Sequence, residues 1–232
     1  MYESNATTDR ERYVVKKNEL IQRSKYILTA QEQKLLSLLI SKIKPEDTEL
    51  YVQEFDLRYI CELFGIQVAG KNYKDLKDKL KAMRDKSFWI TDPKTGKDSL
   101  CGWISSISIS RSDMTVQVRL DPDLSPFLLQ VKELYTMYKL KSVICLESKY
   151  AIRFYEILKS YSNIGEYTVE LNDLRELLQI DGYSVYKDLR EKVIDNSVLE
   201  INTKTDINVN YEPLRTGRSI THLKFTITKS KE

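Results

Sequence analysis

The amino-acid sequence predicts an α+β protein of two tandem winged-helix domains related by pseudo-symmetry. Two strings recur in the same order: DLR at Asp56–Arg58 and Asp173–Arg175, followed by YKDL at Tyr73–Leu76 and Tyr186–Leu189. Hydrophobic periodicity gives both halves the order helix, helix, turn, helix, β-hairpin. Each YKDL string falls at the start of the third helix, so the repeats indicate one structural module that is used twice.

The predicted domains are a flexible N-terminal tail over residues 1–13, an N-terminal winged-helix domain over 14–134 and a C-terminal winged-helix domain over 135–232. The tail is polar, and polar chain ends fray unless neighbouring elements hold them. The boundary follows Asp121–Pro126, where two prolines interrupt the strand pattern. Two domains of roughly 100 residues can each bury a sufficient core.

Three helices are predicted in the N-terminal half. Thr29 and Glu32 form a capping box, because the threonine oxygen can accept an amide proton while the glutamate reaches back, and the helix after it ends near Lys44. The second and third helices are expected over Phe55–Phe64 and Asn72–Lys86, where apolar residues recur three and four positions apart. In such folds the third helix enters a DNA major groove.

Strands complete the first unit. A hairpin is predicted from a strand at Phe88–Ile90, a turn at Asp92–Lys97 and a return strand over about Leu100–Ile109, because turn residues separate two strand-like runs. Thr115–Leu120 is expected to be a third strand, and Phe127–Leu134 a short connecting helix.

The C-terminal half repeats this order. Ser148 is predicted to cap its first helix, a short strand follows at Tyr167–Val169, and Asn172 is predicted to cap the second helix. The third helix is expected over Ser184–Ile194. The final hairpin has strands at about 199–211 and 218–228, and its tip is Pro213–Arg218.

Composition disfavours an enzyme. The one histidine, His222, cannot form a two-histidine metal site, and the three cysteines are too scattered for a zinc site or a disulfide framework. The seven glycines form no phosphate-binding loop. We therefore expect no catalytic residue, no metal and no cofactor, although a metal site made only of carboxylates stays open.

The location follows from two further absences. No apolar run approaches the ~18 residues that a membrane-spanning helix needs, and the N-terminus lacks the apolar core of a signal peptide. We expect a cytoplasmic protein without a membrane partner. The net charge of +3 is small, so a nucleic-acid site must depend on where the charges lie.

The third helix of the first unit carries a basic stripe. Lys74, Lys77, Lys81 and Arg84 are spaced three, four and three residues apart, opposite the apolar positions. Such a stripe can neutralise DNA phosphates and release condensed counterions. The alternative is a solvated helix face, since Asp78 and Asp85 project near the same side.

The corresponding helix of the second unit is nearly neutral. Lys187, Arg190 and Lys192 alternate with acidic residues, a pattern that suits base reading better than phosphate binding. Ser184 is expected at the helix N-terminus, where it can bind a phosphate or a base. Simple helix solubility is an equally weighted alternative.

The two predicted hairpin tips and the repeated tyrosines complete the candidate set. Tip residues on wings touch phosphates or enter the minor groove, but they are also ordinary surface residues. Helical spacing indicates that the two YKDL tyrosines point inward as core anchors rather than as stacking platforms for single strands. The basic residues at the tips are Lys94, Lys97, Arg215 and Arg218.

Spaced motifs then identify a family. The chain carries KNELI at Lys17–Ile21, LT and EQKLL within Leu28–Leu36, SKYAIRFYEIL at Ser148–Leu158, and EIN, TD, YE, GR and LKF between Glu200 and Phe225. In their order they resemble the iteron-binding replication initiator (Rep) proteins of theta-replicating bacterial plasmids. One departure is Ile194–Val198, where relatives often carry a stretch like LxPAI.

The resemblance implies two pseudo-symmetric winged-helix domains that bind repeated origin DNA, the iterons, as a monomer. It further implies dimers, paired largely through the N-terminal domain, that bind an inverted repeat and repress the initiator's own gene. A host replication initiator and a helicase are the implied partners, in bacterial cytoplasm on plasmid or nucleoid DNA. Because an exposed strand edge can pair with its twin, we expect the dimer surface to include Ile104–Ile109 and Val116–Leu120.

Three alternatives remain at this point. A winged-helix transcriptional regulator without origin activity would have the same fold. A nicking replication enzyme would need the missing histidine pair. A protein–protein scaffold of winged helices would show no salt-dependent DNA binding.

Overall fold

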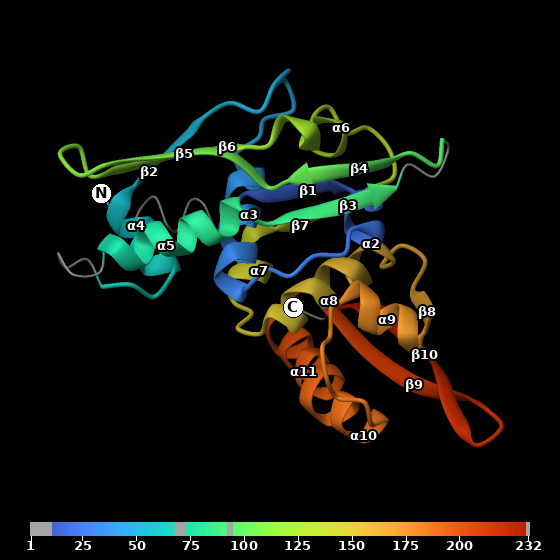
Figure 1. The fold of residues 1–232 in the computed structure, drawn as a ribbon. Helices are drawn as coiled ribbons and strands as arrows, with labels where there is room; N and C mark the ends of the chain where they lie inside the picture. Colours follow the sequence, from blue (N-terminus) through green and yellow to red (C-terminus); the bar gives the residue numbers. More distant parts are fainter. Residues whose placement is uncertain (1–10, 68–72, 92–94, 231–232) are drawn as a thin grey trace.

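The fold contains two copies of one three-stranded arrangement. The computed structural model describes residues 11–67, 73–91 and 95–230. Each half has an antiparallel sheet whose last strand lies between the other two, in the orders β2-β6-β5 and β8-β10-β9 (Figure 1). The same order of pairing in both halves is the pseudo-symmetry that the sequence predicts.

The first half contains the longer series of elements. A two-stranded ribbon, β3-β4, is inserted between its third helix and the strands β5 and β6. In chain order its elements are β1 (Tyr13–Lys17), α2 (Asn18–Arg23), α3 (Ala30–Ser41), β2 (Gln53–Asp56), α4 (Leu57–Leu63), α5 (Tyr73–Arg84), β3 (Ser87–Thr91), β4 (Asp98–Gly102), β5 (Ile104–Ser110), β6 (Thr115–Leu120), η1 (Pro122–Leu124) and α6 (Ser125–Leu128).

Local side-chain caps set where the first helices begin. The predicted capping box at Thr29 and Glu32 is confirmed, and α3 ends at Ser41, earlier than predicted. The prediction of a helix from Phe55 is wrong, because Phe55 pairs with Val116 in the strand β2. The side chain of Asp56 then accepts a hydrogen bond of 2.6 Å from the backbone N–H of Arg58, so α4 begins one residue after it.

The predicted single strand Leu100–Ile109 is wrong, because the chain divides at Trp103. The indole of Trp103 is buried and stacks on Phe88, with 4.2 Å between the ring centroids. Burying this side chain turns the backbone out of the ribbon β3-β4, which pairs Ser87–Thr91 with Asp98–Gly102, and into β5 of the next sheet.

The strand after the predicted domain boundary pairs with the start of the chain. β7 (Tyr135–Lys139) is antiparallel to β1, with Tyr13 opposite Lys139, so Tyr13 belongs to a strand and not to a tail. Residues 1–10 of the predicted tail lie outside the described residues. The predicted connecting helix Phe127–Leu134 is wrong, since α6 ends at Leu128. The division between 134 and 135 stays a prediction.

The second half is built around a long helical run. α10, a π-helical turn η2 and α11 are continuous, so the predicted third helix starts two residues later and ends ten residues later than expected. The predicted strand therefore begins at Ile207 rather than near residue 199. The elements of this half are α7 (Leu140–Ile144), α8 (Lys149–Ser160), β8 (Glu166–Glu170), α9 (Leu171–Leu177), α10 (Tyr186–Leu189), η2 (Arg190–Ile194), α11 (Asp195–Lys204), β9 (Ile207–Thr216) and β10 (Ser219–Lys229).

Two predicted caps differ in outcome. The hydroxyl of Ser148 accepts hydrogen bonds from the N–H groups of Tyr150 and Ala151, so the predicted cap of α8 is confirmed. Asn172 is not a cap, because α9 begins at Leu171. The helix follows β8 directly, with Glu170 in an extended conformation at the N-cap position and no side-chain hydrogen bond there.

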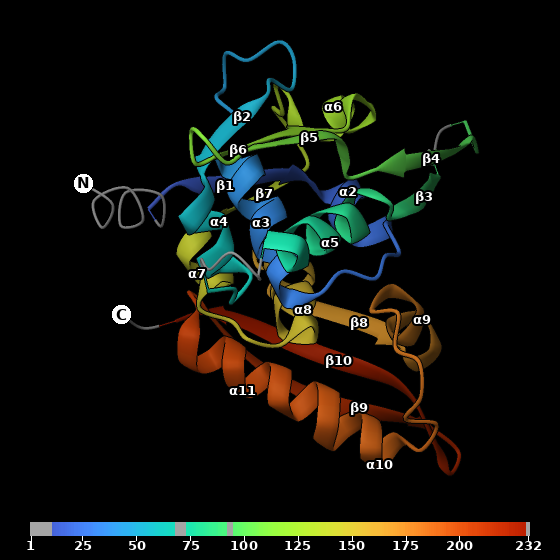
Figure 2. The same cartoon turned by 60° about the vertical axis from the view of Figure 1, so that its left-hand side comes forward.

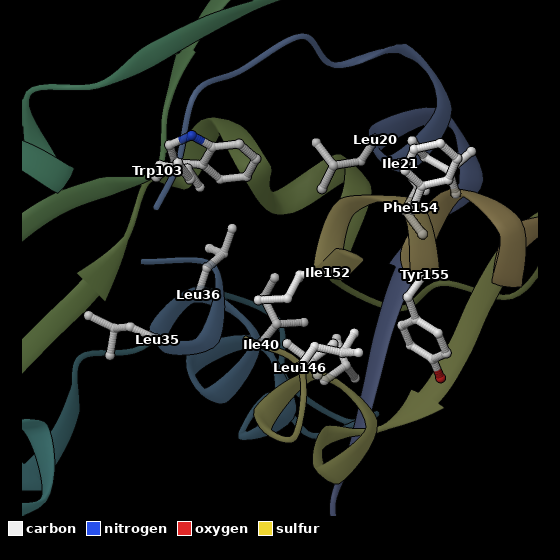
Figure 3. Packing of buried hydrophobic residues seen from close by; sticks show 14 of the residues in the cluster. Leu20, Ile21, Leu35, Leu36, Ile40, Trp103, Leu146, Ile152, Phe154 and Tyr155 are labelled. Atoms are coloured by element: carbon white, nitrogen blue, oxygen red, sulfur yellow. The ribbon is translucent and has the colours of Figure 1, made fainter. Parts of the chain in front are cut away.

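One continuous core joins the two halves. Figure 3 shows Ile21 of α2 beside Phe154 of α8, and Ile40 of α3 near Ile152 of α8. Every residue from Ala151 to Leu158 is buried, because α8 packs against elements of both halves. In Figure 2, α8 lies between the first-half helices and the sheet of β8, β9 and β10.

A buried cluster of charges fixes this junction. The ammonium of Lys16 on β1 lies 2.5 Å from a carboxylate oxygen of Glu156 on α8, and both side chains are nearly inaccessible to solvent. The hydroxyl of Tyr138 on β7 also donates to Glu156. Arg153 donates to the carbonyls of Ile21 and Ser24 at 2.6 and 2.8 Å. The cluster therefore ties α8 to both strands of the β1-β7 ribbon and to the end of α2.

Candidate nucleic-acid interface

The helix α5 presents its predicted basic stripe to solvent. Leu76, Leu80 and Met83 are buried on one side of the helix, which fixes its orientation on the core. The remaining face is available to a polyanion because its side chains are exposed to solvent. All four predicted basic residues on this face are exposed: Lys74, Lys77, Lys81 and Arg84.

The four cations differ in how they are engaged. Lys81 forms an ion pair with Asp85, and the guanidinium of Arg84 donates to the carbonyl of Ser105 at 3.3 Å. The ammonium of Lys77 lies 5.8 Å from the ring centroid of Tyr73. Within the described residues, no hydrogen bond or ion pair engages the side chain of Lys74. Exposed ion pairs are worth little, so all four side chains can turn to phosphate.

The two YKDL tyrosines have different surroundings. Tyr186 packs against the core, as predicted, and its hydroxyl is buried. The prediction that Tyr73 is a core anchor is wrong, because its ring is half-buried at the surface. The guanidinium carbon of Arg111 lies 3.6 Å from the Tyr73 ring centroid, a cation–π contact.

Arg111 is a basic residue that the sequence analysis missed. It lies in the turn between β5 and β6, and these strands occupy the same sheet positions as β9 and β10 of the second unit. The β5–β6 turn is therefore the wing of the first unit. Its topological equivalent in the second unit is the turn that contains Gly217 and Arg218. The topological order of the strands is the signal that could have found it.

The predicted assignment of the first wing to the hairpin at 92–97 is wrong for the same reason. That hairpin joins β3 and β4, which form a separate two-stranded ribbon. Lys97 is exposed there, whereas Lys94 lies outside the described residues. In the second unit Arg215 and Arg218 are both exposed, at the tip of the β9-β10 hairpin as predicted.

The helical run from α10 into η2 carries the second predicted set. Lys187 is exposed in the first turn. Arg190 lies between two carboxylates, 3.3 Å from Glu191 and 3.5 Å from Asp195. The ammonium of Lys192 lies 5.4 Å from the ring centroid of Tyr183. The π-helical turn thus places Arg190 and Lys192 at the surface, each beside a partner from its own unit.

Ser184 is not at the helix N-terminus. α10 begins at Tyr186 with Val185 as its N-cap, so Ser184 precedes the cap. Its carbonyl accepts a hydrogen bond of 3.4 Å from the guanidinium of Arg175. Its side chain is exposed and close to the helix start, but it is not the cap that the sequence predicts.

Two other kinds of site are absent from the described ranges. Over residues 11–67, 73–91 and 95–230, no three His, Cys, Asp or Glu side chains are grouped so that they could hold a metal ion. In the same part of the chain, no helix combines the length and the apolar character needed to cross a bilayer. The exposed basic residues on the two third helices and the wings are the candidate site.

Comparison with known families supports this arrangement. Residues 13–159 match the model described as "Initiator Replication protein, WH1". The chain belongs to the initiator replication protein family. Residues 170–227 match the companion model, "Initiator Rep protein, WH2", so the two matches cover both halves of the initiator and confirm the predicted fold class.

Solved structures show the same fold. The initiator aligns with the crystal structure of Pi initiator protein in complex with iteron DNA at a TM-score of 0.72 and 17% sequence identity, over 96% of this chain and 99% of that one. Domains 2 and 3 of RctB align at a TM-score of 0.50 and 12% identity, over 89% of this chain and 84% of that chain.

Proposed function

We propose that this chain is a non-enzymatic plasmid replication initiator that binds the repeated iteron DNA of its origin through both winged-helix units. The observation that carries the proposal is the repeated sheet order, because it identifies one wing in each unit. In both units this wing and the third helix carry exposed basic residues. The likeness over almost its whole length to Pi initiator protein, whose structure contains iteron DNA, supports this substrate.

A replication assay tests the proposal against a transcriptional regulator of the same fold. A mini-plasmid that carries the origin but lacks its initiator gene should replicate in the host only when this chain is supplied from elsewhere. Failure to replicate, together with specific DNA binding, would favour the regulator.

A nicking assay tests the non-enzymatic part of the proposal. Relaxation of supercoiled origin DNA by the purified chain with Mg²⁺ would show strand cleavage and contradict it. The proposed partners, a host initiator and a helicase, should bind in pull-downs with purified proteins.

The first wing gives a prediction about affinity. Replacing Arg111 by Ala should remove one phosphate contact, so the slope of log K against log salt should become shallower by about 0.9. The loss should be equal on cognate and random duplexes. The matched control is Lys97→Ala on the β3-β4 hairpin, for which no change in slope is expected. The opposite result, with Lys97 altering the slope and Arg111 leaving it unchanged, would restore the wing assignment made from sequence.

The proposed dimer, which represses the initiator's own gene, requires a free strand edge. β6 lies between β2 and β5, so the predicted contribution of Val116–Leu120 as an edge is wrong. Of the two strands that the sequence assigned to the dimer surface, β5 is the one at an edge of this sheet, and β2 forms the opposite edge. Ser108 is an exposed residue on β5. A lysine there should oppose edge pairing between two copies.

We therefore expect Ser108→Lys to raise the dissociation constant of the dimer about tenfold, equivalent to about 1.4 kcal/mol. Light scattering across micromolar concentrations measures it. Asn163→Lys, at an exposed site between α8 and β8, is the control. Equal dimerisation of wild type and both variants would rule out pairing through β5.

A further inference from the structure

The loop before α10 is held in a strained conformation. Gly182 and Tyr183 both have positive φ angles, of 97° and 51°. The left-handed region is open to glycine but costs a tyrosine energy, so surrounding contacts must maintain it. The chain therefore enters the third helix of the second unit along a path that is fixed by tertiary contacts rather than by local preference.

Arg175 supplies those contacts. Its guanidinium donates to three successive carbonyls, at 3.2 Å to Gly182, 2.7 Å to Tyr183 and 3.4 Å to Ser184. Arg175 is the arginine of the second DLR string and belongs to α9, so it ties the loop to the preceding helix. The ammonium of Lys192 lies over the Tyr183 ring, 5.4 Å from its centroid.

This arrangement exposes an apolar side chain at the helix start. Val185 is the N-cap of α10, and 59% of its surface is accessible. Its carbonyl accepts the N–H of Leu189 at 3.2 Å, so the helical run begins at this residue. Ser184, directly before it, and Lys187, two residues after it, are exposed and polar.

The chemistry of the major groove offers one apolar partner to such a side chain. The first residues of a recognition helix contact base edges, and the C5-methyl of thymine is the apolar group presented there. Valine is stiff at χ1, so little side-chain freedom is lost when it packs against that methyl.

We propose that Val185 reads the C5-methyl of one thymine in the cognate duplex and that Arg175 is the positioning residue that presents it. This inference rests on the proposed function, because it requires α10 to enter the major groove. It assigns a specificity role to a residue that carries no charge, in a helix whose charges nearly cancel.

Deoxyuridine substitution tests the inference by removing only the methyl group. The probe is a duplex that the wild-type chain selects from a library of random sequences, with each thymine replaced in turn by deoxyuridine. At one position the wild-type affinity should fall about fourfold, the loss expected for one methyl-sized contact. Val185→Ala should bind the unmodified duplex more weakly and lose nothing further at that position. Val52→Ala, a similarly exposed valine, should behave as wild type.

The role of Arg175 has its own readout. Arg175→Lys keeps the charge but lacks the planar fork of guanidinium N–H groups that reaches the three carbonyls. It should therefore also lose the deoxyuridine effect, while its affinity for random duplex stays within about twofold of wild type. A selected site without an invariant thymine, or equal deoxyuridine losses in wild type and Val185→Ala, would overturn the inference. Wild type that fails to select any sequence would overturn the proposed function itself.

Discussion

Replacing Glu156 by Ala should lower the free energy of unfolding by about 3–5 kcal/mol, because removal of one partner leaves buried charges uncompensated. In this variant the buried ammonium of Lys16 loses its carboxylate partner, and the hydroxyl of Tyr138 loses its acceptor. Arg153 keeps its bonds to two carbonyls but loses the nearby carboxylate. Urea unfolding followed by circular dichroism measures the loss.

The matched control is the same substitution at Glu176. Its ion pair with Lys25 spans 2.6 Å, but both side chains are more than half exposed. Exposed pairs contribute about 0–1 kcal/mol, so Glu176→Ala should be nearly neutral. Equal losses in the two variants would show that the cluster at the junction has no special role in stability.

The same cluster sets an acid dependence. Burial tends to raise the pKa of Glu156, but Lys16, Arg153 and Tyr138 outweigh it, so the pKa is lowered. A carboxyl whose folded pKa is depressed contributes stability above its unfolded pKa of about 4.3, and that contribution is lost as pH falls through the lower folded value. Wild type should therefore lose stability below about pH 4. Glu156→Gln should show a shallower loss over the same range.

Removing the basic stripe of α5 should have the largest effect on DNA affinity. In the variant with all four residues changed to Ala, the slope of log K against log salt should become shallower by about 3–4, since each phosphate contact contributes about 0.9. Binding should weaken on every duplex, cognate or random. The four substitutions are Lys74→Ala, Lys77→Ala, Lys81→Ala and Arg84→Ala.

A control variant removes the same charge from elsewhere. Its residues are exposed and lie outside the third helices and the wing turns: Lys44, Lys132, Lys141 and Lys229. It should keep most of the wild-type slope, because net charge alone acts only through long-range attraction that salt screens. An equal loss in both variants would mean that α5 is an ordinary solvated helix, the alternative that the sequence left open.

Local signals predicted the start of each third helix to within two residues. Both YKDL strings open a helix, at the first residues of α5 and α10, and both of their leucines are fully buried. Short-range hydrophobic spacing and caps are enough for such features, because they depend on neighbours three or four residues away. The basic face of α5 followed from the same spacing.

Long-range pairing could not be predicted in this way. β1 pairs with β7 across more than a hundred residues, and strand preference depends on the partner that the fold supplies. Residues 199–204, which include the β-branched Ile201 and Thr203, were predicted as strand but are helical. There Ile201 is buried, and the amide of Asn202 exchanges hydrogen bonds with the backbone of Val209. Tertiary contacts overrode the local preference.

The wing was misplaced for a topological reason. The inserted β3-β4 ribbon has its own turn, and a linear pattern cannot show which hairpin belongs to the sheet β2-β6-β5. Arg111 became a candidate only when the sheet order of the second unit was matched to that of the first. The hydrogen bonds from Arg175 to the carbonyls of Gly182 and Tyr183 could not be predicted either, since they join a helix to the backbone of a loop.

The most direct test of the account is competition binding at one fixed salt concentration. A duplex that carries one direct repeat from the plasmid origin is compared with a scrambled duplex of the same length and composition. An initiator that reads its repeat through two winged-helix units should prefer the repeat by about a thousandfold or more, and its footprint should cover two successive major grooves. Equal affinity for the two duplexes would contradict the account.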